Sequence, residues 1–223
     1  MHLAKAINTQ IMKSELVKSW GTTVTTSSFK KMMNEILAPF GARAFIKRVS
    51  MKSLMKLKIG GCYWSTYRGA KIVVSYHMAH RRKKVFLSTR VINRIIFLTS
   101  QTLQHELIHQ AQEKRLGAEF YVKRIPVVFS KRIQKKRKDD VVYYSMKEEV
   151  DCYGQNIAME LVYRYPNESP RNLLKAIDKR KSQSFRAYKK TFDGTDWTDL
   201  RKALLKKVWK WLPLVTAPPR LAS

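Results

Sequence analysis

Hydrophobic residues recur at helical spacing in several stretches of the chain. Between about Phe29 and Ala38 they form one stripe, which Ser27 or Ser28 can cap at its start. Similar stripes predict helices at residues 100–115, 146–163, 171–181 and 196–212. Thr99 or Ser100 is expected to cap the first of these, and Gly117 lies where a helix should stop. The chain is therefore expected to be rich in helices.

Other stretches alternate between apolar and polar residues, as strands do. Two strands are expected at residues 62–67 and 70–76, joined as a hairpin at Arg68-Gly69, and a short one at 85–88. Residues 43–60 show no period that decides between helix and strand. Residues 131–138 hold six Lys or Arg in eight positions and predict a solvated basic loop. Together these elements predict an α+β fold with a small antiparallel or mixed sheet packed on helices.

Composition adds a strong basic bias. The 223 residues suffice for one sizeable core, and they include 45 Lys and Arg against 16 Asp and Glu. Residues 1–100 contain only two acids, Glu15 and Glu35. Such a field attracts nucleic acid or an acidic protein surface, although a basic surface can also serve solubility alone. No apolar run approaches the ~18 residues of a membrane span, and the N-terminus lacks the apolar centre of a secretory signal. We therefore expect no membrane span and no secretion.

One motif carries candidate chemistry. In His105-Glu106-Leu107-Ile108-His109 the two histidines are four residues apart, so on a helix both imidazoles lie on one face and can reach one metal ion. This H-E-x-x-H spacing is that of zinc peptidases, where the glutamate acts on a water. The flanking residues, from Thr102 to Ala111, carry no charge apart from Glu106. The alternative is a pair of ordinary histidines on an amphipathic helix.

A catalytic zinc ion needs a third protein ligand. No histidine follows His109, and His77 and His80 stand next to a run of four cations, which disfavours metal. Cys62 and Cys152 form no C-x-x-C pair, so no cysteine-based zinc site or disulfide framework is expected. The remaining candidates are the acids of the helix at 146–163, which are Glu148, Glu149 and Asp151. They can also be a solvated helix face.

The order of strand 85–88, H-E-x-x-H helix, variable loop and Glu-bearing helix resembles the zincin metallopeptidases of the glutamate type. It is similar in particular to short peptidases encoded by bacteriophages. Phe86-Leu87-Ser88 and the Thr102-Leu103 start also resemble SprT-like proteases, which act near DNA, although this chain lacks their third histidine and cysteine knuckle. The resemblance implies a zincin-like domain at residues 27–182. An N-terminal arm at 1–26, a helical extension at 183–212 and a tail at 213–223 would complete the chain.

The resemblance also implies a site. Zn²⁺ would be held by His105, His109 and Glu149, with Glu148 as the runner-up ligand and Asp151 orienting a histidine. Glu106 would be the general base for a metal-activated water that attacks a peptide carbonyl. The small residues Cys152 and Gly154 would face the active-site helix, and the oxyanion donor would be one of three tyrosines, Tyr143, Tyr144 or Tyr153.

A protein or peptide is thus the expected substrate, and the host cytoplasm or a virion is the expected location. The competing expectation is a non-catalytic protein that keeps the zincin fold. Such a protein would serve a virion or nucleoprotein assembly through its basic surface and tryptophans.

Overall fold

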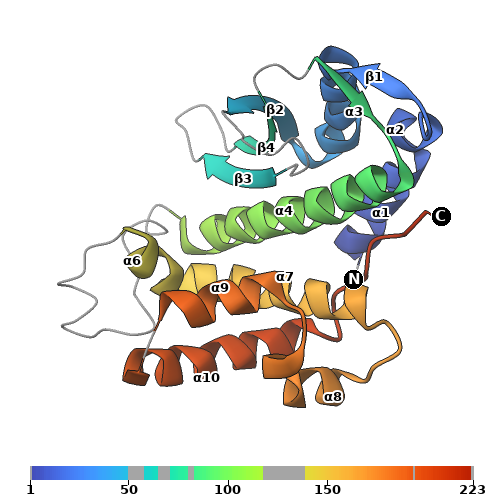
Figure 1. The fold of residues 1–223 in the computed structure, drawn as a ribbon. Coiled ribbons are helices and arrows are strands. Elements are labelled where there is room, and N and C mark those ends of the chain that lie inside the picture. Colours follow the sequence, from blue (N-terminus) through green and yellow to red (C-terminus); the bar gives the residue numbers. More distant parts are fainter. Residues whose placement is uncertain are drawn as a thin grey trace. The chain divides into compact units, whose positions relative to one another are not determined.

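A computed structural model gives the structure of the chain, and it describes residues 2–49, 58–64, 71–79, 83–117, 139–192 and 194–221 (Figure 1). The chain divides into two compact units. The first comprises residues 1–110 with 218–223, and the second comprises residues 111–217. Each unit has its own hydrophobic core. Within the described ranges, no helix combines the length and the apolar character needed to cross a membrane.

The first unit begins with helices and a short strand. These are α1 (His2–Lys13), α2 (Glu15–Lys18), β1 (Thr23–Thr25), α3 (Thr26–Leu37) and the 3-10 turn η1 (Ala38–Phe40). Ile7, Ile11 and Leu16 are fully buried in the same core as Phe29 of α3. Residues 2–25, expected as an arm, thus contribute to the core. The cap of α3 is Thr25, which accepts a hydrogen bond from Ser28 N, and not Ser27 or Ser28.

The sheet of the first unit is mixed, as the sequence predicts. Its strands are β2 (Ala42–Val49), β3 (Lys58–Trp64) and β4 (Lys71–Ala79), in the order β2-β4-β3. The antiparallel pairing of β3 with β4 confirms the expected strand pair, and the turn at Arg68-Gly69 lies outside the described residues. β2 runs parallel to β4, which resolves part of the undecided stretch at 43–60. A second, two-stranded sheet pairs β1 with β5 (Lys84–Phe86).

The motif helix, α4 (Thr89–Leu116), is 28 residues long and starts well before the expected position. Its first turn is stabilised by Ser88, whose Oγ accepts from Val91 N and whose carbonyl accepts from Ile92 N. Thr99 and Ser100 are therefore not caps. Both are fully buried inside the helix, and Thr99 Oγ1 lies 3.0 Å from the hydroxyl of Tyr76 on β4. Gly117 has the left-handed φ of 62° that the expected stop requires.

The second unit is helical beyond the last turns of α4. It contains α6 (Asp139–Ser145), α7 (Lys147–Arg164), α8 (Pro170–Lys175), the 3-10 turn η3 (Ile177–Lys179), α9 (Gln183–Thr191) and α10 (Gly194–Trp211). The expected helix at 171–181 is thus divided into α8 and η3, and α9 precedes α10 as a separate helix. The basic stretch at 131–138 lies outside the described residues.

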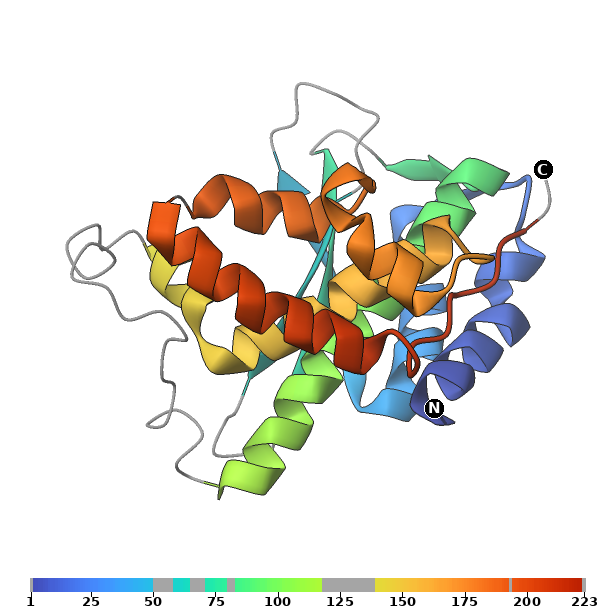
Figure 2. The same cartoon turned by 90° about the horizontal axis from the view of Figure 1, so that it is seen from below.

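The packing of this unit centres on α7, which lies along α10 in both views (Figures 1 and 2). Gly154 makes this approach possible, because a Cβ there would lie 2.5 Å from Cβ of Lys207. Gly154 thus faces α10 and not the motif helix, which corrects the expectation from the sequence.

The buried carboxylate of Glu160 on α7 serves the start of α9. It accepts hydrogen bonds from Ser182 Oγ, Ser184 Oγ and Ser184 N. A carboxylate is favoured at a helix N-terminus by the exposed N–H groups there.

The last described residues return to the first unit. Leu221 N donates to Asn93 Oδ1 of α4 at 2.8 Å, and Asn93 Nδ2 donates back to Leu221 O at 3.1 Å. The segment expected as a tail is therefore anchored at its described end.

Candidate metal centre

The two motif histidines converge as their spacing predicts. His105 and His109 lie on α4 with exposed fractions of 7% and 4%, and their Nε2 atoms are 3.2 Å apart. Two nitrogens bound at ~2.0–2.1 Å to one tetrahedral zinc ion would be about 3.3 Å apart. The separation of the two nitrogens in the structure therefore fits two ligands of one ion.

Glu106 is held by a close approach of the sheet. An added Cβ at Gly61 of β3 would lie 2.5 Å from Glu106 Oε1 and 2.5 Å from Thr102 Cγ2. Glycine at position 61 thus lets the strand backbone pass directly over this face of α4. The carboxylate is buried, with an exposed fraction of 6%, next to a backbone in the edge strand of the sheet.

A further potential ligand belongs to the second unit, and the sequence did not indicate it as one. Cys152 on α7 is a fully buried free thiol. Histidine and cysteine are both residue types that bind zinc, so His105, His109 and Cys152 are candidate metal ligands.

The placement of Cys152 follows from contacts with the end of α4. Gln112 comes three residues after His109 on the same uninterrupted helix. Its Nε2 donates to the carbonyl of Glu148 at 3.4 Å, and Cys152 Sγ lies 4.0 Å from its Oε1. Both partners of Gln112 belong to α7, one turn apart. From the sequence, Cys152 was expected only as a small packing residue. Its position one turn after Glu148 was the one feature of the sequence that could have indicated it as a ligand.

The two expected acidic ligands are both buried, with exposed fractions of 7% for Glu148 and 2% for Glu149. Glu148 lines a hollow of about 190 Å³ with Gln112 and Asp151. Its Oε2 has no hydrogen-bond partner among the residues that the structure describes. The role of Glu149 as a ligand stays a prediction.

Glu149 lies near a cluster of tyrosine rings in the second unit. Burial raises the pKa of Tyr188 well above its ordinary value, and the negative charges of Tyr153 and Glu149 raise it further. The Tyr188 hydroxyl donates to the carbonyl of Tyr144, and the rings of Tyr144 and Tyr153 each lie 5.3 Å from that of Tyr188. Which tyrosine could serve as an oxyanion donor stays a prediction.

Asp151 is bound elsewhere than expected. Its carboxylate accepts from Trp211 Nε1 at 3.1 Å and from Lys210 Nζ at 3.3 Å, and it pairs with Lys207 at 3.3 Å. These partners all belong to α10. Asp151 therefore stabilises the packing of α7 on α10. Its expected role in orienting a histidine stays a prediction.

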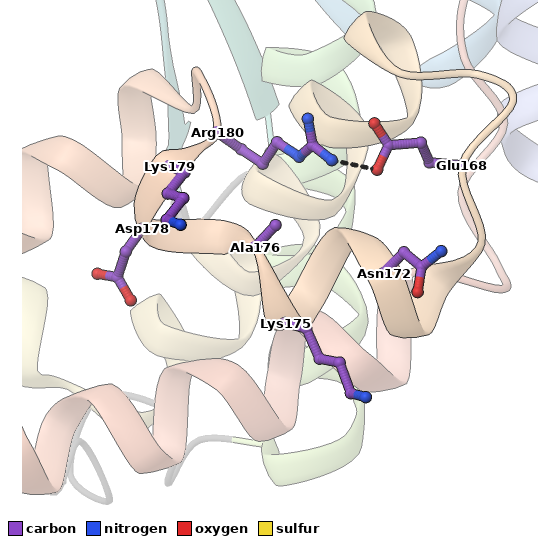
Figure 3. Close-up of a pocket in the computed structure, with 7 residues that line it drawn as sticks. All are labelled: Glu168, Asn172, Lys175, Ala176, Asp178, Lys179 and Arg180. Carbon is purple, nitrogen blue, oxygen red and sulfur yellow. Dashed lines mark hydrogen bonds and ion pairs between the residues drawn. The ribbon is translucent and has the colours of Figure 1, made fainter.

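A second hollow, of about 570 Å³, lies at α8 and η3 (Figure 3). The close-up shows Arg180 and Glu168 directed at each other, and they form an ion pair. Asp178 is paired with Arg201 and Lys189. This hollow is lined by no histidine or cysteine. It offers charge but no set of metal ligands, so the histidine pair of α4 is the stronger candidate site.

Comparisons with protein-family models, with curated proteins and with solved structures find no match to this chain.

Proposed function

We propose that this chain is a zinc-dependent peptidase of the zincin type, with His105 and His109 as metal ligands and Glu106 as the general base. The observation that carries the proposal is the 3.2 Å separation of the two buried Nε2 atoms, which matches two ligands of one tetrahedral ion. A bound zinc ion would supply Lewis acidity toward a carbonyl oxygen and toward water. The expected origin in a bacteriophage and location in host cytoplasm or virion belong to this proposal.

The chain's own groups support proton transfer. Glu106 adjoins His105 in the motif, and its buried carboxylate is held under Gly61. A carboxylate in a water-poor setting is suited to take a proton from the attacking water and to return it to the leaving amine.

A peptide is the substrate class that the surroundings favour. β3 is an edge strand, because it pairs with β4 on one side only within the described sheet. An edge strand offers backbone N–H and C=O groups to an extended peptide. Glycine at position 61 leaves the strand backbone next to Glu106 without a side chain. An extended chain bound there would bring its carbonyl groups near the base.

For the third ligand we propose Cys152, because it is a buried free thiol on α7 and cysteine is a common zinc ligand. Glu149 is the competing ligand. A thiolate is a stronger zinc donor than a carboxylate, and its negative charge offsets part of the Lewis acidity of the ion. The two possibilities therefore predict different affinities and different spectra.

Metal analysis of the purified full-length chain tests the site. We expect about one zinc per chain in the wild type and loss of zinc in His105→Ala. Cys152→Ser should weaken zinc binding strongly, whereas Glu149→Gln should weaken it little. In the cobalt-substituted protein, a thiolate-to-cobalt charge-transfer band should be present and should vanish in Cys152→Ser. The reverse pattern would assign Glu149 as the ligand, and a wild type without zinc would reject the whole centre.

Glu106→Gln tests the activity separately. This change keeps the shape of the side chain but removes the base, so cleavage of an unfolded protein such as casein should fall by at least about 100-fold. The zinc content should stay at the wild-type level. A wild type that binds zinc and cleaves neither casein nor a mixed peptide library would favour the non-catalytic alternative.

A further inference from the structure

The sheet β2-β4-β3 has two unlike faces. On β4, Ile72, Val74, Tyr76 and Met78 are buried, and on β3 Gly61 faces α4. The residues between them point to the opposite face. On β2, Arg43, Phe45 and Lys47 are exposed there, while Ala42 and Ala44 are buried. Phe45 has an exposed fraction of 51%, which is high for a phenylalanine. This second face is the open face of the sheet.

The charge around the open face is of one sign. The chain from residue 36 to residue 105 contains fourteen Lys and Arg and no Asp or Glu, and this stretch includes all three strands. Arg43 and Lys47 belong to none of the ion pairs found in the described parts of the chain. On β4, the partners of β2 on this face are Val73, Ser75 and His77, which carry no acid. Among the described residues of these strands, a polyanion would meet no acidic side chain on this face.

We propose that the open face binds single-stranded nucleic acid, with a base stacked on Phe45 and phosphates held by Arg43 and Lys47. Side chains two apart on a strand lie about 7 Å apart, so one cation stands on each side of the aromatic ring. An exposed ring set among cations on a sheet is the arrangement that accepts an unpaired base and its backbone. This surface shares no residue with the metal centre, so the proposal does not depend on the peptidase proposal.

The edge of β2 extends the basic surface. A hollow of about 610 Å³ lies beside it, lined by α3 and β2 residues that include Lys30, Asn34 and Arg43. Lys30 is exposed and stands at the side of the hollow opposite to β2, on α3. The hollow can receive a phosphate next to the one held by Arg43. The path of the nucleic acid would thus cross the sheet edge near Arg43.

A single strand fits better than a duplex or a lipid surface. In a duplex the bases are stacked on one another, so Phe45 would contribute nothing to binding. Binding to an anionic membrane would depend mainly on the charge of the protein. Removing the Phe45 ring would then weaken binding no more than removing another exposed aromatic ring. The specific role of Phe45 therefore separates the three partners.

Binding of fluorescein-labelled dT20 to the full-length protein, measured by anisotropy at several salt concentrations, tests the proposal. Phe45→Ala should weaken binding roughly tenfold, since base stacking on an aromatic ring contributes ~1–3 kcal/mol. Phe45→Trp should bind within about twofold of the wild type, because it keeps a stacking surface. Phe86→Ala is the matched control, since Phe86 is 53% exposed on β5 and should not matter.

The charges are tested in the same assay. In Arg43→Gln/Lys47→Gln the plot of log affinity against log salt should become shallower, with the magnitude of its negative slope reduced by about 1.4. Each phosphate contact on a single strand contributes about 0.7 to that magnitude. Lys175→Gln/Lys206→Gln removes the same charge from exposed positions of α8 and α10 and should change the slope less. Equal effects of the two double variants, or of Phe45→Ala and Phe86→Ala, would overturn the proposal. So would equal affinity for a 20-base-pair duplex or for vesicles rich in anionic lipid.

Discussion

The geometry of the candidate site depends on single residues, and the clearest example is Gly61, which lies against Glu106. A methyl group at this position would meet Glu106 Oε1 and Thr102 Cγ2 at 2.5 Å, which no relaxed structure accepts. Gly61→Ala should therefore push the Glu106 carboxylate aside and destabilise the protein by about 1–3 kcal/mol. Urea unfolding gives the stability, and the cleavage assay gives the effect on the base, which should be a loss of most activity.

The neighbouring glycine provides the control. A Cβ at Gly60 would meet nothing within 4 Å, and its backbone lies in the same strand. Gly60→Ala should thus leave the cleavage rate unchanged. If the two variants behave alike, the close approach of β3 to Glu106 does not matter for the site.

Tyr76 predicts a dependence of stability on pH. Burial raises the pKa of Tyr76 above its ordinary value of 10.0, and the bond to Thr99 opposes this only in part. The folded protein thus keeps this phenol neutral, while the unfolded chain ionises near pH ~10. The stability that the neutral Tyr76 phenol contributes is complete below that pH. It is lost as the pH rises toward the pKa of Tyr76 in the folded protein. The loss is up to about 1.4 kcal/mol per pH unit.

The variant Tyr76→Phe separates this effect from the rest of the alkaline transition. At pH 7 it should be less stable by about 1 kcal/mol, because Thr99 loses a buried hydrogen-bond partner. Above pH 10 its unfolding free energy should fall less steeply than that of the wild type. Tyr143, which is 40% exposed, gives the comparison variant Tyr143→Phe. Parallel profiles for wild type and Tyr76→Phe would contradict the assignment.

The sequence located part of the site because the geometry of a helix alone determines it. A spacing of four positions on one helix brings His105 and His109 together, whatever surrounds them. Cys152 was not predicted as a ligand because its position depends on the rotation of α7 about its own axis. That rotation is fixed by Gln112, by Asp151 and by Gly154 against Lys207, and these contacts leave no periodic signal.

At the level of elements, the main error concerns the start of α4. Thr99 and Ser100 form a polar pair within an apolar run, which is the usual pattern of a helix cap. In the structure both are buried, and Thr99 meets Tyr76 of the sheet. A buried threonine that contacts a tyrosine hydroxyl cannot be distinguished from a cap without the sheet in place. The starts of α7 and α8 were predicted better, since Ser169 and Pro170 give a purely local signal.

The contact between α7 and α10 gives a prediction of unusual sign. If helix propensity alone decided the outcome, Gly154→Ala should stabilise the protein by about 1 kcal/mol. Its Cβ would, however, lie 2.5 Å from Lys207 Cβ and 3.0 Å from the Lys207 carbonyl carbon. We therefore expect a net destabilisation of about 1–3 kcal/mol, because backbone atoms cannot move as a side chain can. Thermal and urea unfolding measure it.

A compensating change tests the cause. Lys207→Gly removes the Cβ that the new methyl group would meet. The double variant Gly154→Ala/Lys207→Gly should therefore lose less stability than the sum of the two single variants. Additive losses, or a Gly154→Ala variant more stable than the wild type, would exclude the packing explanation.

At the scale of the whole molecule, charge opposes folding. The chain carries a formal net charge of +29 at pH 7, and the ion pairs in the described parts use few of its cations. Self-repulsion of this size weakens the compact state and is relieved by a bound polyanion. The same field that favours nucleic acid on the open face of the sheet thus makes the free protein sensitive to salt.

We therefore expect the melting temperature to rise when NaCl is increased from about 0.05 M to about 0.5 M, since the Debye length falls from about 14 Å to about 4 Å. Exposed ion pairs such as Lys18 with Glu15 would lose strength over this range, but each contributes little. A control variant with Gln at Lys5, Lys30, Lys47, Lys175 and Lys206 lowers the charge by five, from +29 to +24. It should melt higher at low salt and respond less to NaCl. A melting temperature that falls with salt, in both proteins alike, would mean that attractive pairs outweigh the repulsion.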